Sequence, residues 1–118
     1  MPMKITRATA LSAFECLASG LRLDIYRLLV KHAPDGLVAG QIATTLALPP
    51  SNLSFHLKAL THAQLITVTQ EGRYQRYRAA LALMDALIGY LTAHCCAGHP
   101  EQCGATAAST RRQAKSCA

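Results

Sequence analysis

One stretch of the sequence decides the fold that we expect, Ser51-Asn52-Leu53-Ser54-Phe55-His56-Leu57-Lys58-Ala59-Leu60. Its three leucines, Leu53, Leu57 and Leu60, recur at the spacing of one helix face, so the stretch predicts an amphipathic helix over residues 51–62. Helical spacing gathers a second set on the opposite side. That set consists of Ser51, Ser54, Phe55, Lys58 and His62. Hydroxyls and a cation on an outer helix face can reach base edges and phosphates, so this face is a candidate for DNA contact.

Two rings in this helix need separate interpretation. Phe55 on an outer face is costly in water, but its ring can pack on a thymine methyl or a sugar. The alternative is that Phe55 packs beneath a neighbouring loop. His56 leans toward the core face, and we expect its role to be structural.

Three more helices are expected before this one. The stretch around Val38, Ile42 and Leu46 predicts a short helix, and Leu48-Pro49-Pro50 connects it tightly to the next, with Pro50 in a first turn. Together they predict a helix-turn-helix over residues 38–62. Upstream, Ser19 caps a helix that runs to about His32 and whose expected buried face is Leu21, Ile25, Leu28, Leu29 and His32. The first helix has an apolar stripe formed by Ala10, Leu11, Phe14, Leu17 and Ala18.

A strand pair is expected after the helix-turn-helix. Ile66-Thr67-Val68-Thr69 alternates, and so does the segment of residues 73–78. Glu71-Gly72 marks the turn, and because Glu suits a left-handed position poorly, a loop of more than two residues is an option. The second strand carries Arg73, Arg76 and Arg78 with no acid between Gly72 and Ala79. These arginines can contact phosphates or a minor groove, or they can be ordinary surface charge.

The last expected helix spans about Ala80 to Cys96 and is apolar nearly all round. Such a helix needs burial on several sides, and a two-fold homodimer that pairs it with the first helix would provide this burial. We expect one domain over residues 1–103 and a disordered tail over residues 104–118, which is small and polar. The fold class is thus mainly α with a β-hairpin wing, a winged helix-turn-helix.

Composition supports an intracellular nucleic-acid partner. The chain has 118 residues and a net charge of +6, which suits a polyanion, although solubility alone would also explain the charge. Its most apolar run, residues 79–93, contains Asp85 and is too short for a bilayer span, so no membrane is expected. Five cysteines without a signal peptide argue for reduced thiols and a cytoplasmic location.

The helix stretch above and the run Gly72-Arg73-Tyr74-Gln75-Arg76-Tyr77-Arg78 resemble the ArsR/SmtB family of bacterial metal-responsive repressors. Leu17-Ala18-Ser19 followed by Arg22-Leu23-Asp24-Ile25 is also similar, so the resemblance covers residues 8–95. It implies a winged-helix homodimer that binds double-stranded operator DNA until a metal ion releases it. The implied DNA contacts are Ser51, Asn52, Ser54, Phe55, His56, Lys58, Arg73, Arg76 and Arg78.

Two metal sites common in that family are missing here. The stretch Leu37-Val38-Ala39-Gly40-Gln41-Ile42-Ala43 lacks the Cys-x-Cys pair of the best-known arsenic sensors. Asp85 is followed by Ala86 and Leu87, so the zinc ligands of the last helix are absent too.

A different thiol cluster remains, formed by Cys95, Cys96 and Cys103. It resembles a branch of the family with a three-thiolate arsenite site at the end of the last helix. Adjacent Cα atoms lie about 3.8 Å apart, too close for an ordinary disulfide, so Cys95 and Cys96 suit neighbouring ligands better. Three thiolates match the pyramidal, soft centre As(III), and also Sb(III).

Other uses of these cysteines stay open. Zinc or cadmium could bind if His94 or His99 supplied a fourth ligand, and Cys95 or Cys96 could be oxidised against Cys103 in a redox or persulfide sensor. The cysteines could also simply pack at a dimer end. Cys16 is expected in the core and Cys117 as a bystander.

Catalysis is not expected. Positions 101 and 102, six residues after Cys95 and Cys96, are Glu101 and Gln102, so the arginine of a Cys-x₅-Arg phosphatase loop is absent. No Cys-x-x-Cys beside a βαβ unit and no Ser-His-Asp pattern stands out. A metal carrier that does not bind DNA is a third class, and the helix-turn-helix argues against it.

Overall fold

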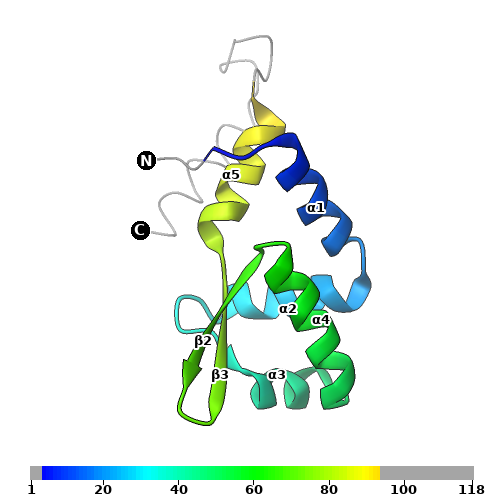
Figure 1. The fold of residues 1–118 in the computed structure, drawn as a ribbon, viewed down its shortest axis with the longest axis vertical. Helices are drawn as coiled ribbons and strands as arrows, with labels where there is room; N and C mark the ends of the chain where they lie inside the picture. Colours follow the sequence, from blue (N-terminus) through cyan, green and yellow to red (C-terminus); the bar gives the residue numbers. More distant parts are fainter. Residues whose placement is uncertain (1–3, 94–118) are drawn as a thin grey trace. The chain divides into compact units, whose positions relative to one another are not determined.

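The computed structural model describes residues 4–93. They form, in chain order, α1 (Arg7–Leu17), α2 (Gly20–Lys31), β1 (Leu37–Val38), α3 (Ala39–Leu46), α4 (Pro50–His62), β2 (Ile66–Glu71), β3 (Tyr74–Ala79) and α5 (Leu81–Thr92) (Figure 1). The strands make one antiparallel sheet in the order β1-β3-β2. The chain divides into two compact units after Leu87, within α5. The first unit confirms the expected architecture, mainly α with a β-hairpin.

Both N-terminal helices begin with the caps that their sequences favour. Thr6 accepts a hydrogen bond from the Thr9 amide at 3.1 Å, and Ser19 accepts one from the Arg22 amide at 3.5 Å. These side-chain oxygens satisfy N–H groups that have no partner inside a helix. The predicted cap at Ser19 is therefore confirmed.

The apolar stripe predicted for α1 is rotated in the structure. Ala10 is buried as expected, but the other buried residues are Ala13 and Cys16, whereas Leu11 is 55% exposed and Phe14 37%. Small side chains at i, i+3 and i+6 let the helix backbone approach the core closely, which turns the larger apolar residues outward. The expected core position of Cys16 is confirmed.

The buried face of α2 also differs from its prediction at both ends. Ile25, Tyr26 and Leu29 are buried, while Leu21 in the first turn and His32 at the C-cap are exposed. The helix packs through its central turns, so its terminal residues lie beyond the core. Burial also raises the pKa of Tyr26 to about 12, because the charged phenolate loses its hydration.

Strand β1 was not predicted. It pairs with β3 so that Leu37 lies opposite Tyr77 and Val38 opposite Arg76. The approach depends on Gly36, whose φ is +73°, because a Cβ there would collide with the carbonyl oxygen of Tyr77 and lie 2.8 Å from Cγ of Arg78. Only glycine combines this backbone conformation with so close a neighbour.

The turn between β2 and β3 lies one residue later than predicted. Glu71 still belongs to β2, opposite Tyr74, and the loop is only the pair Gly72-Arg73. Gly72 has φ +60°, as the first position of a tight hairpin turn requires, so Glu71 avoids the left-handed conformation that made a longer loop an option. We call this β2–β3 hairpin the wing.

The last described helix is shorter than expected. It begins at Leu81 and ends at Thr92, whose hydroxyl donates to the carbonyl of Ile88 at 2.8 Å. Only Leu83 and Leu87 are buried on it. Cys95 and Cys96, which we expected in its final turn, lie outside the described residues, and so does the domain boundary expected after residue 103. None of the described helices is both long and apolar enough to cross a membrane.

Candidate nucleic-acid interface

Helix α4 separates its two faces as the sequence predicts. Leu53, Leu57 and Leu60 are at most 2% exposed and contribute to the core. The residues expected on the outer face are all exposed: Ser51, Ser54, Phe55, Lys58 and His62. Asn52 is exposed as well. The sequence stretch that predicts the fold therefore also gives an outer face that is open to a partner.

The exposure of Phe55 argues against one of its two interpretations. Its side chain is 67% exposed, so it does not pack beneath a neighbouring loop. The only aromatic partner found for it within residues 4–93 is His56, whose ring meets it edge-on at 5.5 Å between centroids. The exposed Phe55 ring is available for apolar contact with a ligand.

His56 lies between the two faces of α4. It is half-buried, and its Nδ1 atom is buried without a hydrogen-bond partner among residues 4–93. Its edge-on contact with Phe55 fixes the direction of one face of that ring. This geometry agrees with the structural role that we expect for His56.

The beginning of α4 is suited to a phosphate. Pro49 occupies the N-cap without a side-chain hydrogen bond, and Pro50 follows at the first helical position. The first amide that donates a helical hydrogen bond is that of Leu53, whose acceptor is the carbonyl of Pro49 at 3.0 Å. The amides of Ser51 and Asn52 therefore precede the helical hydrogen-bond ladder, at the positive end of the helix dipole.

Two of the three wing arginines are engaged by an acid. Nε of Arg76 donates to both carboxylate oxygens of Glu71, at 2.9 and 3.0 Å, and an Nη1 of Arg76 donates to the carbonyl of Gly36 at 3.4 Å. Nη2 of Arg78 lies 3.8 Å from the same carboxylate, and its Nη1 donates to Thr69 at 3.1 Å. The sequence interval from Gly72 to Ala79 contains no acid, but Glu71, just before it, pairs with both arginines.

A signal in the sequence could have found this carboxylate. Across a two-residue hairpin, Glu71 lies opposite Tyr74 and diagonal to Arg76, on the same face of the sheet. Once the turn is placed at Gly72-Arg73, the spacing of five residues between Glu71 and Arg76 predicts the ion pair. Arg73 itself lies in the turn and is exposed, with no ion pair among the described residues.

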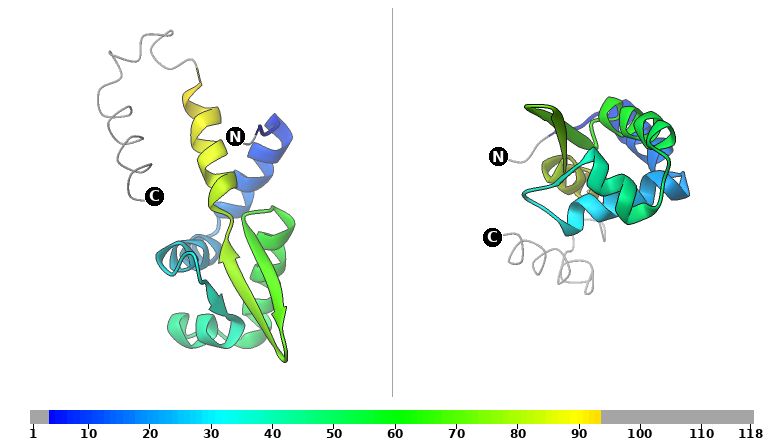
Figure 2. Two further views of the ribbon diagram at one scale, coloured as in Figure 1. Left: turned by 90° about the vertical axis from the view of Figure 1, so that its left-hand side faces the viewer. Right: turned by 90° about the horizontal axis from the view of Figure 1, so that it is seen from below.

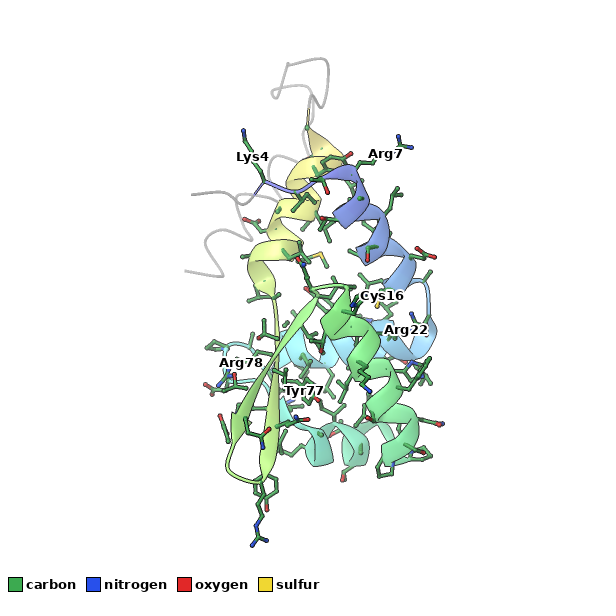
Figure 3. The ribbon with its side chains drawn as sticks, in the orientation of Figure 1. Lys4, Arg7, Cys16, Arg22, Tyr77 and Arg78 are labelled. Carbon is green, nitrogen blue, oxygen red and sulfur yellow. The ribbon has the colours of Figure 1, made fainter. Side chains whose placement is uncertain are left out.

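The two sides of β3 differ in their surroundings. Tyr77 is 8% exposed on the side toward the helices, and Arg78 lies on the other side (Figure 3). The hydroxyl of Tyr77 donates to Oε1 of Gln75 at 3.1 Å, and burial raises the Tyr77 pKa above its ordinary value. Tyr77 thus anchors the wing to the core while the arginine face stays accessible.

A recess of about 150 Å³ lies between α3, the first turns of α4 and β3. Its wall is mostly apolar, and Ser54 and Gln75 bring polar groups to it. In two views, α3, the start of α4 and the tip of the wing lie at the same end of the first unit (Figures 1 and 2). The first turn of α4 and the wing tip with Arg73 therefore lie at the same end of this unit.

The expected thiol site lies outside the described residues. Cys16 is buried in the core, and Cys95, Cys96, Cys103 and Cys117 lie outside the described residues. Within residues 4–93, no group of three or more His, Cys, Asp or Glu side chains could hold a metal ion.

Comparison with known proteins agrees with this geometry. Residues 17–69 match the family model of a helix-turn-helix domain. An ArsR-like transcriptional regulator from Rhodococcus sp. RHA1 is 28% identical with a TM-score of 0.64, and the match covers 92% of this chain and 89% of that one. HlyU from Vibrio cholerae N16961 is 26% identical with a TM-score of 0.60, over 75% of this chain and 97% of HlyU. The chain has the winged helix-turn-helix fold.

A further winged-helix structure is known as a homodimer. The DNA-binding domain of Mb0332 from Mycobacterium bovis, a possible ArsR-family transcriptional regulator, is 27% identical with a TM-score of 0.58, over 84% of this chain and 96% of that one. No curated protein matches the present winged-helix chain significantly. In the winged helix-turn-helix fold, α4 is the second helix of the helix-turn-helix and thus lies at the recognition position.

Proposed function

We propose that this chain is a transcriptional repressor of the ArsR type that binds double-stranded operator DNA as a homodimer. One observation carries the proposal: the outer face of α4 presents Ser54, Lys58 and a 67% exposed Phe55 beside a wing with an exposed Arg73 at its tip. Hydroxyl, cation and apolar ring together provide hydrogen bonds, phosphate pairing and contact with thymine methyls. The net charge of +6 favours the same partner.

Exposed apolar side chains support the homodimer. On α1, Leu11 is 55% and Phe14 is 37% exposed, and on the end of α5 Leu91 is 63% exposed. A second copy covering such residues would remove apolar surface from water at about 25 cal/mol per Å². A two-fold pair also presents two α4 helices to successive half-sites of DNA. Sedimentation at micromolar concentration should give a dimer, and a monomer alone would contradict this part.

For the inducer we propose As(III), bound by Cys95, Cys96 and Cys103. The support is the chemistry of the donor set, because three thiolates suit a soft, three-coordinate centre whose lone pair fills the fourth direction. Sb(III) shares this chemistry. These residues follow α5, where a local change could alter the spacing of two recognition helices. Such coupling between sites is typically about 1–3 kcal/mol, or roughly 5–150-fold in DNA affinity.

The test has two steps. Fluorescence anisotropy with the protein's own promoter fragment first measures DNA binding, which should be tight and specific. The complex is then titrated in parallel with arsenite, antimonite, zinc and peroxide. Release by arsenite and antimonite supports the proposal, whereas release by zinc or cadmium alone, or by peroxide alone, identifies a metal or redox sensor on the same scaffold.

Single substitutions localise the response. Cys95→Ser, Cys96→Ser and Cys103→Ser should each bind the promoter fragment but no longer release it with arsenite. Cys117→Ser is the matched control and should respond normally, as should Cys16→Ser if it remains folded. Normal release by Cys103→Ser at the parent's arsenite concentration would contradict the three-thiolate site.

A further inference from the structure

We propose that Glu71 limits the affinity of the wing for DNA of any sequence by competing with phosphates for Arg78, while it holds Arg76 as a brace of the wing. The inference rests on the proposed function, because it requires DNA as the partner. Glu71 is at the end of β2, and its carboxylate is 41% exposed beside both arginines.

The first step concerns Arg76, which is held more tightly than Arg78. Its Nε atom is shared between both oxygens of Glu71, and its Nη1 reaches the carbonyl of Gly36 at 3.4 Å. The side chain is 27% exposed, less than either Glu71 or Arg78. Arg76 thereby links all three strands of the sheet through the segment that enters β1. A phosphate that bonded to Nε of Arg76 would have to displace the carboxylate of Glu71.

The second step concerns Arg78, which is held more loosely. Its closest approach to the Glu71 carboxylate is 3.8 Å, and its one close hydrogen bond is to the Thr69 hydroxyl at 3.1 Å. At 36% exposure its guanidinium can turn toward solvent. An exposed ion pair of this geometry contributes little to stability, so a phosphate can replace the carboxylate.

The third step follows from the charges. Nonspecific DNA binding is almost entirely electrostatic, whereas specific binding adds contacts with base edges. A carboxylate beside Arg78 repels the phosphate backbone of every sequence and occupies a cation that any sequence could use. Base contacts made by α4 are untouched by it. Glu71 therefore lowers the affinity for operator and random DNA by the same factor and weakens the salt dependence of both.

The experiment compares Glu71→Gln with the parent full-length chain. Glutamine keeps the size of the side chain but removes its charge. Binding is measured between 50 and 200 mM salt on two duplexes: one enriched by selection from a random library and one scrambled with the same composition. Glu71→Gln should bind both more tightly and steepen the salt dependence by about one phosphate contact, which adds about a three- to fourfold loss of affinity over this range. The ratio between the two duplexes should stay the same, because the removed charge acts on the phosphates of both.

Two further variants keep the result interpretable. Glu15→Gln on α1 removes an equal charge from an exposed acid that has no ion pair within residues 4–93, so it should leave slope and ratio unchanged. In an Arg78→Ala background, Glu71→Gln should no longer steepen the slope. If the parent binds DNA but Glu71→Gln leaves the slope unchanged, or tightens only one of the two duplexes, the role of Glu71 is overturned. If the parent binds neither duplex, the proposed function itself fails.

Discussion

Helix α4 and the wing use their polar side chains in opposite ways. Ser51, Ser54 and Lys58 on the outer face of α4 have no side-chain hydrogen bond within the described part of the chain. In the wing, Arg76 and Arg78 bond to Glu71 and Thr69, and Tyr77 bonds to Gln75. A DNA contact by α4 exchanges water for DNA, whereas one by the wing also breaks a bond within the protein. We therefore expect contacts made by α4 to contribute more to DNA affinity than contacts made by Arg76 and Arg78.

The largest difference in stability should appear between substitutions on the two faces of α4. Leu60→Ala removes a fully buried side chain and should lower the free energy of unfolding by about 2–5 kcal/mol. Phe55→Ala removes a mostly exposed ring and should change stability by less than about 0.5 kcal/mol while weakening DNA binding. Urea denaturation and anisotropy measure both quantities. A large loss of stability in Phe55→Ala would show that its ring is not free for DNA.

The wing depends on its attachment at Gly36. Gly36→Ala should cost about 2–3 kcal/mol, because alanine is strained at φ +73° and its Cβ would collide with β3. Gly40→Ala in α3 is the matched control, since nothing lies within 4 Å of its Cβ. It should stabilise the protein by about 0.5–1 kcal/mol. Thermal melting distinguishes the two, and equal melting temperatures would mean that β1 contributes nothing to the fold.

Two buried tyrosines extend the comparison to pH. The Tyr26 hydroxyl has no partner among residues 4–93, and its pKa is raised to about 12. A raised folded-state pKa gives stability that is complete below pH 10 and is lost as pH rises toward 12. The parent should therefore lose about 1.4 kcal/mol by pH 11 relative to Tyr26→Phe, as urea denaturation at pH 8 and pH 11 would measure.

Tyr77 provides the contrast to this result. Tyr77→Phe deletes the hydrogen bond to Gln75 and should destabilise the protein by about 1 kcal/mol at pH 8, where Tyr26→Phe should be neutral or stabilising. If Tyr26→Phe were the more harmful change at pH 8, its hydroxyl would have a partner that the described residues do not include.

The smallest effects should appear in the salt dependence of DNA binding. Lys58→Ala and Arg73→Ala each remove an exposed cation and should reduce the slope by about one phosphate contact. Arg76→Ala should change the slope less, because its guanidinium is already bonded to Glu71 and Gly36. A loss of slope in Arg76→Ala equal to that in Arg73→Ala would mean that phosphates displace the brace.

Sequence patterns predicted the helices better than the sheet, for a physical reason. The leucines of α4 and the cap at Ser19 act within a few residues of each other, so local spacing reveals them. Leu37 and Val38 form a strand only because β3, some forty residues later, is there to pair with them. The rotated face of α1 was missed because size, rather than hydrophobicity, decides which of its residues meet the core.

The candidate site divides in the same way. Helical periodicity placed Ser51, Ser54, Phe55 and Lys58 on one exposed face, and the structure agrees. The pairing of the wing arginines escaped prediction because it depends on the register of the hairpin, which a shift of the turn by one residue changes. The assignment of Cys95, Cys96 and Cys103 still rests on their spacing and chemistry alone.

The pairing of β1 with β3 also sets an order of events during folding. The wing closes through a two-residue loop, and α3 packs on α4 across a short connector. The wing and this helix pair can therefore both form early from local contacts. The register of Leu37 with Tyr77 instead closes a loop of about forty residues, which costs more chain entropy. We therefore expect β1 to join the sheet last, after its partner strand has formed, so that substitutions in β1 accelerate unfolding and leave the folding rate nearly unchanged.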